Sequence, residues 1–158
     1  MFVLMRAITY ATLFIAFVLI FLPAQVLSWA GVAQPQAVGP AQIGGLIVCG
    51  IGAALALSCV AAFAWIGKGT PAPFDPPRTL VIRGPYRWVR NPMYEGAAVA
   101  LAGAALFYRS VALWAFVAAF LVATHLFVIL YEEPHLRRVF GQQYESYCHT
   151  VHRWAPHL

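Results

Sequence analysis

The sequence predicts an all-α integral membrane protein of one domain, with about four transmembrane helices, a helical hairpin and a C-terminal cytosolic helical segment. Of its 158 residues, 62% are hydrophobic and only 9% are charged, whereas roughly a quarter of the residues in soluble domains are charged. Residues 7–67 and 110–131 contain no Asp, Glu, Lys or Arg. A core of this size could not bury so many apolar residues, which excludes a soluble enzyme. The same apolar content excludes a disordered chain.

The first two predicted spans cover residues 4–27 and 42–66. Arg6 precedes the first apolar stretch, as it would in a signal peptide, and Pro23 interrupts the stretch late. This stretch is about twice as long as the apolar part of a signal peptide, and further spans follow it, so an uncleaved helix is the better interpretation. Residues 28–41 are uncharged and contain Gly and Pro, which indicates a loop. The second span is rich in Gly, Ala and Ser, which allow helix backbones to approach closely in lipid.

A polar, proline-rich loop over residues 67–93 precedes the second pair of spans. Its six prolines prevent a continuous helix. The third span, 94–108, is short for a hydrocarbon core of roughly 30 Å, and the fourth covers 110–131. A tight turn around Arg109 joins these two spans, so they form a helical hairpin. The chain becomes polar again in the tail, residues 132–158.

The distribution of Lys and Arg predicts that both termini and the long loop face the cytosol. The loop carries five basic residues, the tail three and the N-terminal end one, whereas the opposite side carries only Arg109. This asymmetry follows the positive-inside rule. It also explains the net charge of +5 without nucleic acid, so we expect no nucleic-acid partner. The expected location is a bacterial-type inner membrane.

Almost every side chain able to do chemistry lies in the loop or the tail, on the same membrane face. Their mixture of Arg, Glu and aromatic groups suits a ligand that is charged, flat and partly apolar, and S-adenosylmethionine has all of those parts. Aromatic residues also anchor helices at any membrane interface. Trp88, Tyr94 and Trp154 are therefore explained equally well as interfacial residues.

Three ionisable residues near the end of the fourth span are further candidates. The adjacent acids Glu132 and Glu133 oppose the preference for cations at the C-terminal end of a helix, although Pro134 would fit the first turn of a new helix that they begin. His125 lies seven residues before Glu132, on the same face of an uninterrupted helix. An ionisable residue inside the membrane is a functional candidate, but a neutral histidine bonded to a neighbouring backbone is an equal alternative.

The cysteines and histidines of the tail do not form a metal-binding pattern. Cys148 and His152 could share a helix face, but His135, His149 and His157 do not complete a four-ligand site. We therefore expect no metal. The chain also lacks a CxxCH sequence, a P-loop and a Gly-x-Gly-x-x-Gly fingerprint, which leaves haem, nucleoside triphosphate and dinucleotide binding without support.

Three segments resemble the isoprenylcysteine carboxyl methyltransferase family. They are Gly-Pro-Tyr-Arg-x-Val-Arg-Asn-Pro-Met-Tyr at 84–94, Glu-Glu-Pro at 132–134 and Phe-Gly-x-x-Tyr-x-x-Tyr at 140–147. The resemblance extends over about residues 67–156. That family belongs to a wider group of integral membrane methyltransferases, which includes the phosphatidylethanolamine N-methyltransferases.

The resemblance implies S-adenosylmethionine as cofactor, bound on the cytosolic side, and a lipidic or isoprenylated acceptor that enters sideways from the bilayer. The cofactor-binding residues that it implies are Tyr86, Arg90, Asn91, Pro92, Tyr94, Gly96, Glu132, Glu133, Tyr144 and Tyr147. The catalytic candidates are Glu132, Arg153 and His125. Arg153 would orient the acceptor or the cofactor carboxylate. Glu132, Glu133 or His125 would take a proton if the acceptor were an amine.

Asn91 stands where the eukaryotic members of that family have His, which removes a titratable group. If the His only bonds the cofactor, Asn can replace it; if it is a base, the acceptor class has changed. A carboxylate or thiolate acceptor needs no base, and the sequence does not choose between these acceptors. The leading hypothesis is methylation of an isoprenylated or similar lipidic acceptor, with phospholipid N-methylation as the alternative. A non-catalytic scaffold that binds anionic lipid is a further alternative, and a transporter has little support because His125 is its only intramembrane ionisable residue.

Overall fold

The computed structural model describes residues 5, 9–10, 12–67 and 79–156. All regular elements in these ranges are helices, with no strand, which confirms the all-α prediction. Three described helices are long and apolar enough to cross a membrane: Thr12–Trp29, Pro40–Gly67 and Val111–Phe140. A fourth helix, α4, is shorter, with 17 residues. Two of the five basic residues of the loop, Lys68 and Arg78, lie outside the described residues, as do His157 and residues 4, 6–8 and 11 of the first predicted span.

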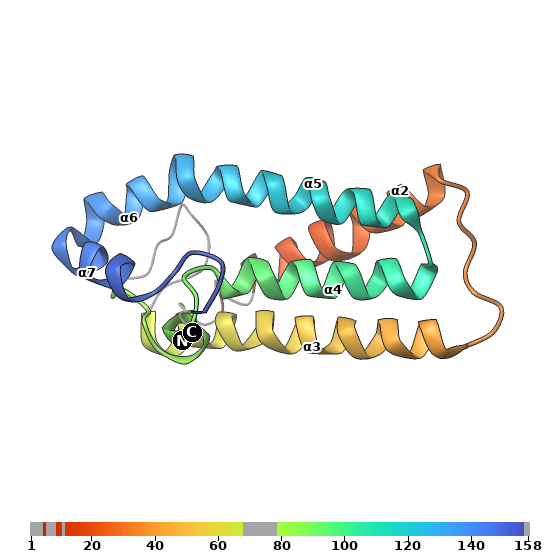
Figure 1. Ribbon diagram of the computed structural model, residues 1–158, viewed down its shortest axis with the longest axis horizontal. Coiled ribbons are helices and arrows are strands. Elements are labelled where there is room, and N and C mark those ends of the chain that lie inside the picture. The colour runs from red at the N-terminus through yellow and green to blue at the C-terminus, as the bar shows by residue number, and fades with distance from the viewer. Residues whose placement is uncertain (1–4, 6–8, 11, 68–78, 157–158) are drawn as a thin grey trace.

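The four long elements follow one another in an up-and-down order (Figure 1). The first helix, Thr12–Trp29, includes η1 (Ile15–Phe21) and α2 (Leu22–Trp29). The second is α3 (Pro40–Ala62), which continues as η2 (Phe63–Gly67). A short turn of helix, η3 (Gly84–Arg87), precedes the hairpin of α4 (Pro92–Tyr108) and α5 (Val111–Phe127). The predicted spans therefore correspond to helices. Their described boundaries differ by a few residues, except that the fourth helix continues past its predicted end at residue 131 to Phe140.

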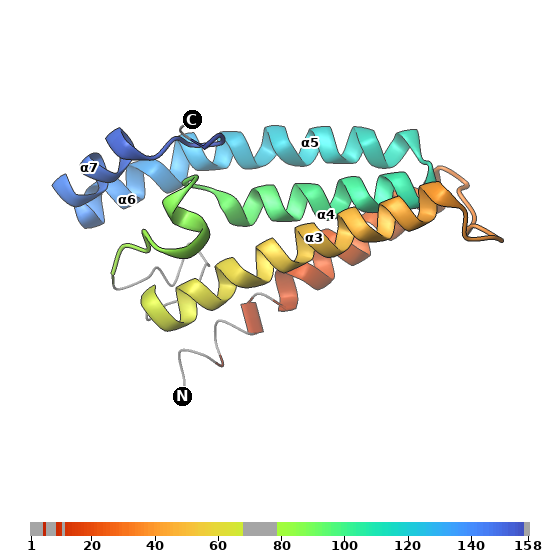
Figure 2. The same cartoon turned by 60° about the horizontal axis from the view of Figure 1, so that its bottom comes forward.

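The predicted hairpin turn has a clear local cause. Arg109 adopts a left-handed conformation with φ of 50°, which ends α4. Ser110 then begins α5, because its side chain accepts a hydrogen bond from the amide of Leu113 at 3.3 Å. Such a cap satisfies one of the unpaired N–H groups at the start of a helix. The turn lies at the end of the bundle opposite the polar segments (Figure 2).

The predicted boundary at residue 131 is wrong, because the helix that begins at Val111 does not end before the acidic pair. It continues through η4 (Val128–Glu132) into α6 (Glu133–Phe140), and α7 (Gln142–Thr150) follows after Gly141. Pro134 is accommodated in the first turn of α6, where its missing N–H does not remove an essential hydrogen bond. Figure 1 shows α5 and α6 as one continuous rod, with α7 folded back beside it.

The contact between α3 and α4 is made by backbone meeting backbone. A Cβ atom added to Gly45 would lie 2.6 Å from the amide nitrogen of Phe107, and one added to Gly96 would lie 2.8 Å from that of Ala56. Gly52 and Gly103 face the other helix in the same way. Helices in lipid associate through such close packing because there is little hydrophobic driving force between them. This glycine seam holds the start of α4 in a fixed position.

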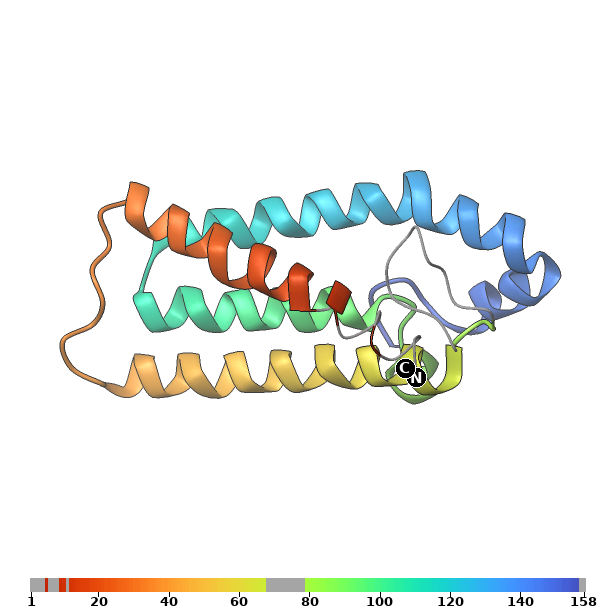
Figure 3. The ribbon, with the colours of Figure 1, turned by 180° about the vertical axis from the view of Figure 1, so that it is seen from behind.

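The first helix is packed much more openly. It crosses α4 obliquely and lies between α5 and α3 when the molecule is seen from behind (Figure 3). Phe14, Val18 and Leu19 touch the buried cluster of α4 and α5, whereas only Pro23 is buried within η1 and α2. Pro23 lacks the N–H that would bond to residue 19, and the turns before it are π-helical, with the amide of Leu22 bonded to the carbonyl of Phe17.

Candidate functional site

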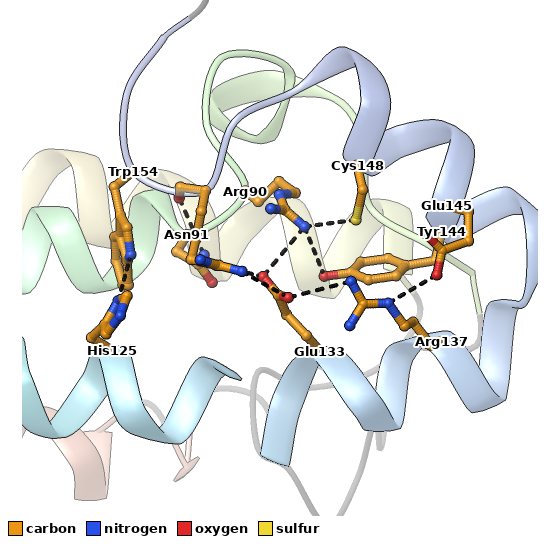
Figure 4. A network of polar contacts seen from close by, with 10 residues as sticks. Arg90, Asn91, His125, Glu133, Arg137, Tyr144, Glu145, Cys148 and Trp154 are labelled. Atoms are coloured by element: carbon orange, nitrogen blue, oxygen red, sulfur yellow. Dashed lines mark hydrogen bonds and ion pairs between the residues drawn. The ribbon is translucent and has the colours of Figure 1, made fainter. Parts of the chain in front are cut away.

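A buried carboxylate, Glu133, lies at the centre of a polar cluster at one end of the bundle (Figure 4). Its residue is 3% exposed. Arg153 binds it with both ends of the guanidinium group, Nε to Oε1 at 2.6 Å and Nη2 to Oε2 at 3.0 Å. Arg90 Nη1 lies 3.3 Å from Oε1, and Arg137 Nη2 lies 3.6 Å from Oε2. Three cations thus compensate one buried anion, as buried charges require.

These partners come from three separate parts of the chain, so the cluster joins the loop, α6 and the tail. The amide of Arg90 donates to the carbonyl of His152 at 2.9 Å. The Asn91 side chain donates to the carbonyl of Arg153 at 3.2 Å. Asn91 therefore holds the tail against the loop through a hydrogen bond that needs no titratable group. The two ionic bonds of Arg153 raise the pKa of its guanidinium group.

Arg90 has further contacts that the sequence did not suggest. Its Nη1 lies 2.6 Å from Cys148 Sγ and 3.5 Å from the hydroxyl of Tyr144. Burial is the main cause that raises the pKa of Tyr144 well above its usual range, so the hydroxyl stays protonated. The sequence offers Cys148 only as a candidate metal ligand, because its spacing to Arg90 in the chain carries no signal of contact.

Tyr147 and Tyr86 close the cluster from the side of the loop. The Tyr147 hydroxyl donates to the carbonyl oxygen of Tyr86 at 2.5 Å, and both side chains are buried. Burial also raises the pKa of Tyr147 well above its usual range. Tyr144, Tyr147 and Val151 form a small apolar cluster on the inner face of the tail. The Tyr-rich segment of the tail is thus joined to residues 84–94 of the loop, the motif loop, by a buried hydrogen bond.

The neighbouring acid, Glu132, has quite different surroundings. Its carboxylate accepts a hydrogen bond from the Tyr94 hydroxyl at 3.0 Å. No Lys or Arg among the described residues forms an ion pair with it, since the ion pairs within this range involve Glu133 and Glu145. Adjacent residues on a helix point in different directions. Glu133 therefore points toward Arg90, Arg137 and Arg153, which form the arginine cluster, whereas Glu132 points toward the neutral phenol of a tyrosine.

Tyr94 also borders a large apolar cavity of about 890 Å³. The first helix, α3, α4 and α5 form the walls, and the lining is almost entirely apolar, with Tyr10, Tyr94 and Thr124 among its few polar side chains. A cavity of this size is within the range of small-molecule sites. The ring of Tyr94 therefore belongs to the apolar cavity, while its hydroxyl reaches the carboxylate at the polar end.

Three buried polar atoms near the polar end have no hydrogen-bond partner within the described part of the chain. They are Arg90 Nε, Glu95 Oε1 and His135 Nε2. Buried polar groups are nearly always paired, so each such atom calls for an explanation. Each is a donor or an acceptor that a polar ligand would satisfy. Neither Glu95 nor His135 was singled out as a binding residue from the sequence.

Other predicted site residues have contacts that serve packing. Gly96 faces α3 in the glycine seam, and Pro92 is completely buried at the start of α4. His125 Nδ1 accepts a hydrogen bond from Trp154 Nε1 at 3.0 Å, with the rings 5.9 Å apart. His125 and Glu132 do not share a partner, because the π-helical turns of η4 change the helical phase on which their common face depended.

The histidines and cysteines of the tail are not gathered around one point. In residues 5, 9–10, 12–67 and 79–156, no three His, Cys, Asp or Glu side chains lie close enough to hold a metal ion. Cys148 lies on α7, but His152 follows the end of that helix, so the two do not share a helix face. Cys148 instead contacts Arg90.

Comparison with known proteins gives one match. A model of the phospholipid methyltransferase family matches residues 40–143, more than half of the chain. No match was found among curated proteins or among solved structures. The match covers the motif loop, the helical hairpin and the acidic pair, and it supports the wider group of membrane methyltransferases more than the isoprenylcysteine subgroup. With its membrane-spanning helices, this protein is an integral membrane protein that belongs to the phospholipid methyltransferase family.

Proposed function

We propose that this protein transfers a methyl group from S-adenosylmethionine to the head group of a membrane lipid, with a lipid amine as the acceptor. The observation that carries the proposal is the position of Tyr94. Its ring lines the apolar cavity, and its hydroxyl binds Glu132 at the polar end. A lipid that enters from the bilayer would have its chains in the cavity and its head group beside this carboxylate.

The residues at the polar end fit the cofactor. S-adenosylmethionine, when bound, supplies an electrophilic methyl group on a positively charged sulfur, and it also has a carboxylate, an ammonium group and ribose hydroxyls. The unpartnered Nε of Arg90 is a donor for a carboxylate, and the unpartnered Oε1 of Glu95 is an acceptor for a hydroxyl or an ammonium group. Arg90, Glu95 and Tyr144 would therefore hold the cofactor, with Tyr147 closing the loop over it.

Glu132 favours an amine over a carboxylate as the acceptor. A carboxylate head group would meet a like charge, whereas an ammonium group would meet an anion that no Lys or Arg of the described residues pairs with. An ammonium group must lose a proton before its nitrogen can form a bond to carbon. A Glu132 carboxylate oxygen would accept that proton, which leaves the nitrogen lone pair free for the transfer. The Tyr94 hydroxyl would hold the carboxylate in place.

The charge distribution supports a cytosolic position for this end of the bundle. Among the described residues, six arginines lie in the loop and tail segments there: Arg83, Arg87, Arg90, Arg137, Arg138 and Arg153. Arg109 lies in the turn at the opposite end. By the positive-inside rule, the polar end and the site would face the cytosol, where S-adenosylmethionine is available.

Methyl transfer from labelled S-adenosylmethionine into membranes that contain the protein tests the proposal. Lipids are extracted and treated with mild alkali. Label that stays on a nitrogen-containing head group supports it, and Glu132→Gln should reduce this label at least about tenfold, while Glu145→Gln, on the exposed face of α7, should not. Label released as volatile methanol would instead show a carboxyl acceptor such as an isoprenylated cysteine. No incorporation above the Glu133→Gln level, with no binding of S-adenosylhomocysteine, would favour the scaffold.

A further inference from the structure

One wall of the apolar cavity comes from a part of the chain that the family match does not include. The match begins at residue 40, whereas the first helix ends at Trp29. This helix nevertheless contributes much of the lining, including Phe14, Val18 and Leu22. Much of the polar site lies within the match, although Tyr144, Cys148 and Arg153 follow its end, and the apolar cavity is completed by a helix that precedes it.

The opposite wall is built differently from the first helix. There, α4 and α5 present small side chains, Ala97, Ala119 and Ala123, beside the rings of Phe116 and Phe120. Small residues leave room, and the aromatic rings provide flat apolar surface. The side chains of the first helix that line the cavity are larger than these alanines, so they determine how much of the room beside the alanines remains. A substitution on this helix changes the cavity without touching the motif loop.

The local structure of the first helix supports a role beyond simple membrane anchoring. Ile15–Phe21 is π-helical, and Phe17 and Val18 of this stretch line the cavity. Short π-helical insertions are rare and frequently occur at functional sites. The helix is also held mainly by contacts with α5 and a few with α4. It forms a wall of the cavity, and Phe14, Val18 and Leu19 of this wall also pack against the buried cluster of α4 and α5.

We infer that the cavity holds the hydrocarbon tail of the methyl acceptor, and that the first helix sets which tail length the enzyme accepts. This inference rests on the proposed function. The occupant follows from continuity, because Tyr94 belongs both to the cavity lining and to the polar end. A bulk lipid does not need a cavity that leads to the polar site, whereas a methyl acceptor needs its tail and its head group to be bound at the same time.

The test compares substitutions on two faces of the same helix. Val18 lines the cavity, while Ile20 is 63% exposed and is not part of the lining. Methyl transfer is measured with dihexanoyl and with dipalmitoyl phosphatidylethanolamine. Val18→Trp should raise KM for the dipalmitoyl lipid about tenfold and leave KM for the dihexanoyl lipid unchanged. Ile20→Trp should change neither. Phe14→Ala, which enlarges the cavity, should shift the preference toward the longer chains.

Binding of S-adenosylhomocysteine and thermal unfolding show whether a variant is folded. If Val18→Trp is misfolded, the chain-length preference of Phe14→Ala tests the inference instead. Equal effects of Val18→Trp and Ile20→Trp, or an unchanged chain-length preference in both cavity variants, would overturn the inference. In that result the wild-type protein still methylates both lipids, so the proposed function stands. If the wild-type protein methylates neither lipid, the proposed function and the inference fail together.

Discussion

The two sides of α4 differ in how closely they pack against the neighbouring helix. Toward α3, glycines such as Gly52 and Gly96 bring the two backbones into direct contact. Toward the first helix, a cavity of about 890 Å³ lies between the helices, and side chains such as Phe14 and Val18 make the contact with the buried cluster of α4 and α5. The rigid side continues into the motif loop and the arginine cluster, and the open side continues into the bilayer. A membrane enzyme for lipids needs both, because its polar site must be ordered while its substrate must enter and leave sideways.

The largest effect is expected where the ordered side carries its buried charge. Glu133→Gln leaves the guanidinium groups of Arg90 and Arg153 without their anion. Removing one partner of a buried ion pair costs about 3–5 kcal/mol, so we expect a loss near 4 kcal/mol in the free energy of unfolding, measured in detergent micelles. Binding of S-adenosylhomocysteine should fall as well, since the loop and the tail lose the carboxylate that joins Arg90 to Arg153.

Glu145→Gln is the matched control for this substitution. Glu145 also pairs with an arginine, Arg137, at 2.8 Å, but its side chain is 42% exposed. An exposed pair contributes about 0–1 kcal/mol, so the unfolding free energy should hardly change. If the two variants were equally stable, the burial of Glu133 would have no energetic consequence, and the ordered end would not depend on its charge cluster.

The next effect tests the glycine seam itself. A side chain on Gly52 would collide with the backbone of Ala100 and Gly96, whereas one on Gly50 meets nothing within 4 Å. Gly52→Val should therefore destabilise the protein by about 3 kcal/mol through overpacking, while Gly50→Val, on the lipid-facing side of the same helix, should cost far less. Unfolding of both variants by denaturant in micelles gives the comparison. Similar losses would mean that the seam can separate without cost.

The ordered side was the more predictable one from the sequence. Long uncharged stretches predict the helices, and the short link around Arg109 predicts their hairpin, because these signals are local. The small residues of the second span predict close packing, although not its partner. The loop and tail were expected to share one site, and Arg90, Glu133, Tyr144 and Arg153 do come together.

The details that the sequence does not predict depend on contacts between distant residues or on helix phase. Nothing local indicates that Cys148 meets Arg90, or that Trp154 binds His125, since 58 and 29 residues separate the partners. The π-helical turns before Glu133 continue the helix through the acidic pair and shift the face of His125. The cavity was not predicted either, because the open packing of the first helix is a property of how the helices are assembled.

The smallest effect concerns the tail and its dependence on pH. Tyr147 donates its hydroxyl proton to the carbonyl of Tyr86, so Tyr147→Phe should cost about 1 kcal/mol in unfolding free energy at neutral pH. Burial raises the pKa of Tyr147 above its value of about 10 in the unfolded chain. The folded state therefore binds this proton more tightly than the unfolded state. The resulting stabilisation is complete below about pH 10 and is lost as the pH rises further.

Stability should accordingly fall above about pH 10 in the wild-type protein, and part of this fall should be absent in Tyr147→Phe. Denaturant unfolding in micelles at neutral and alkaline pH measures the difference. Tyr131→Phe is the control, because the Tyr131 residue is 45% exposed and its ring contacts with Phe127 and His135 do not require the hydroxyl. The same alkaline loss in wild type and Tyr147→Phe would show that the tail is not held by this hydroxyl. The ordered end would then be connected by the ion pairs of Glu133 and by the hydrogen bonds from Arg90 and Asn91 to the backbone of the tail.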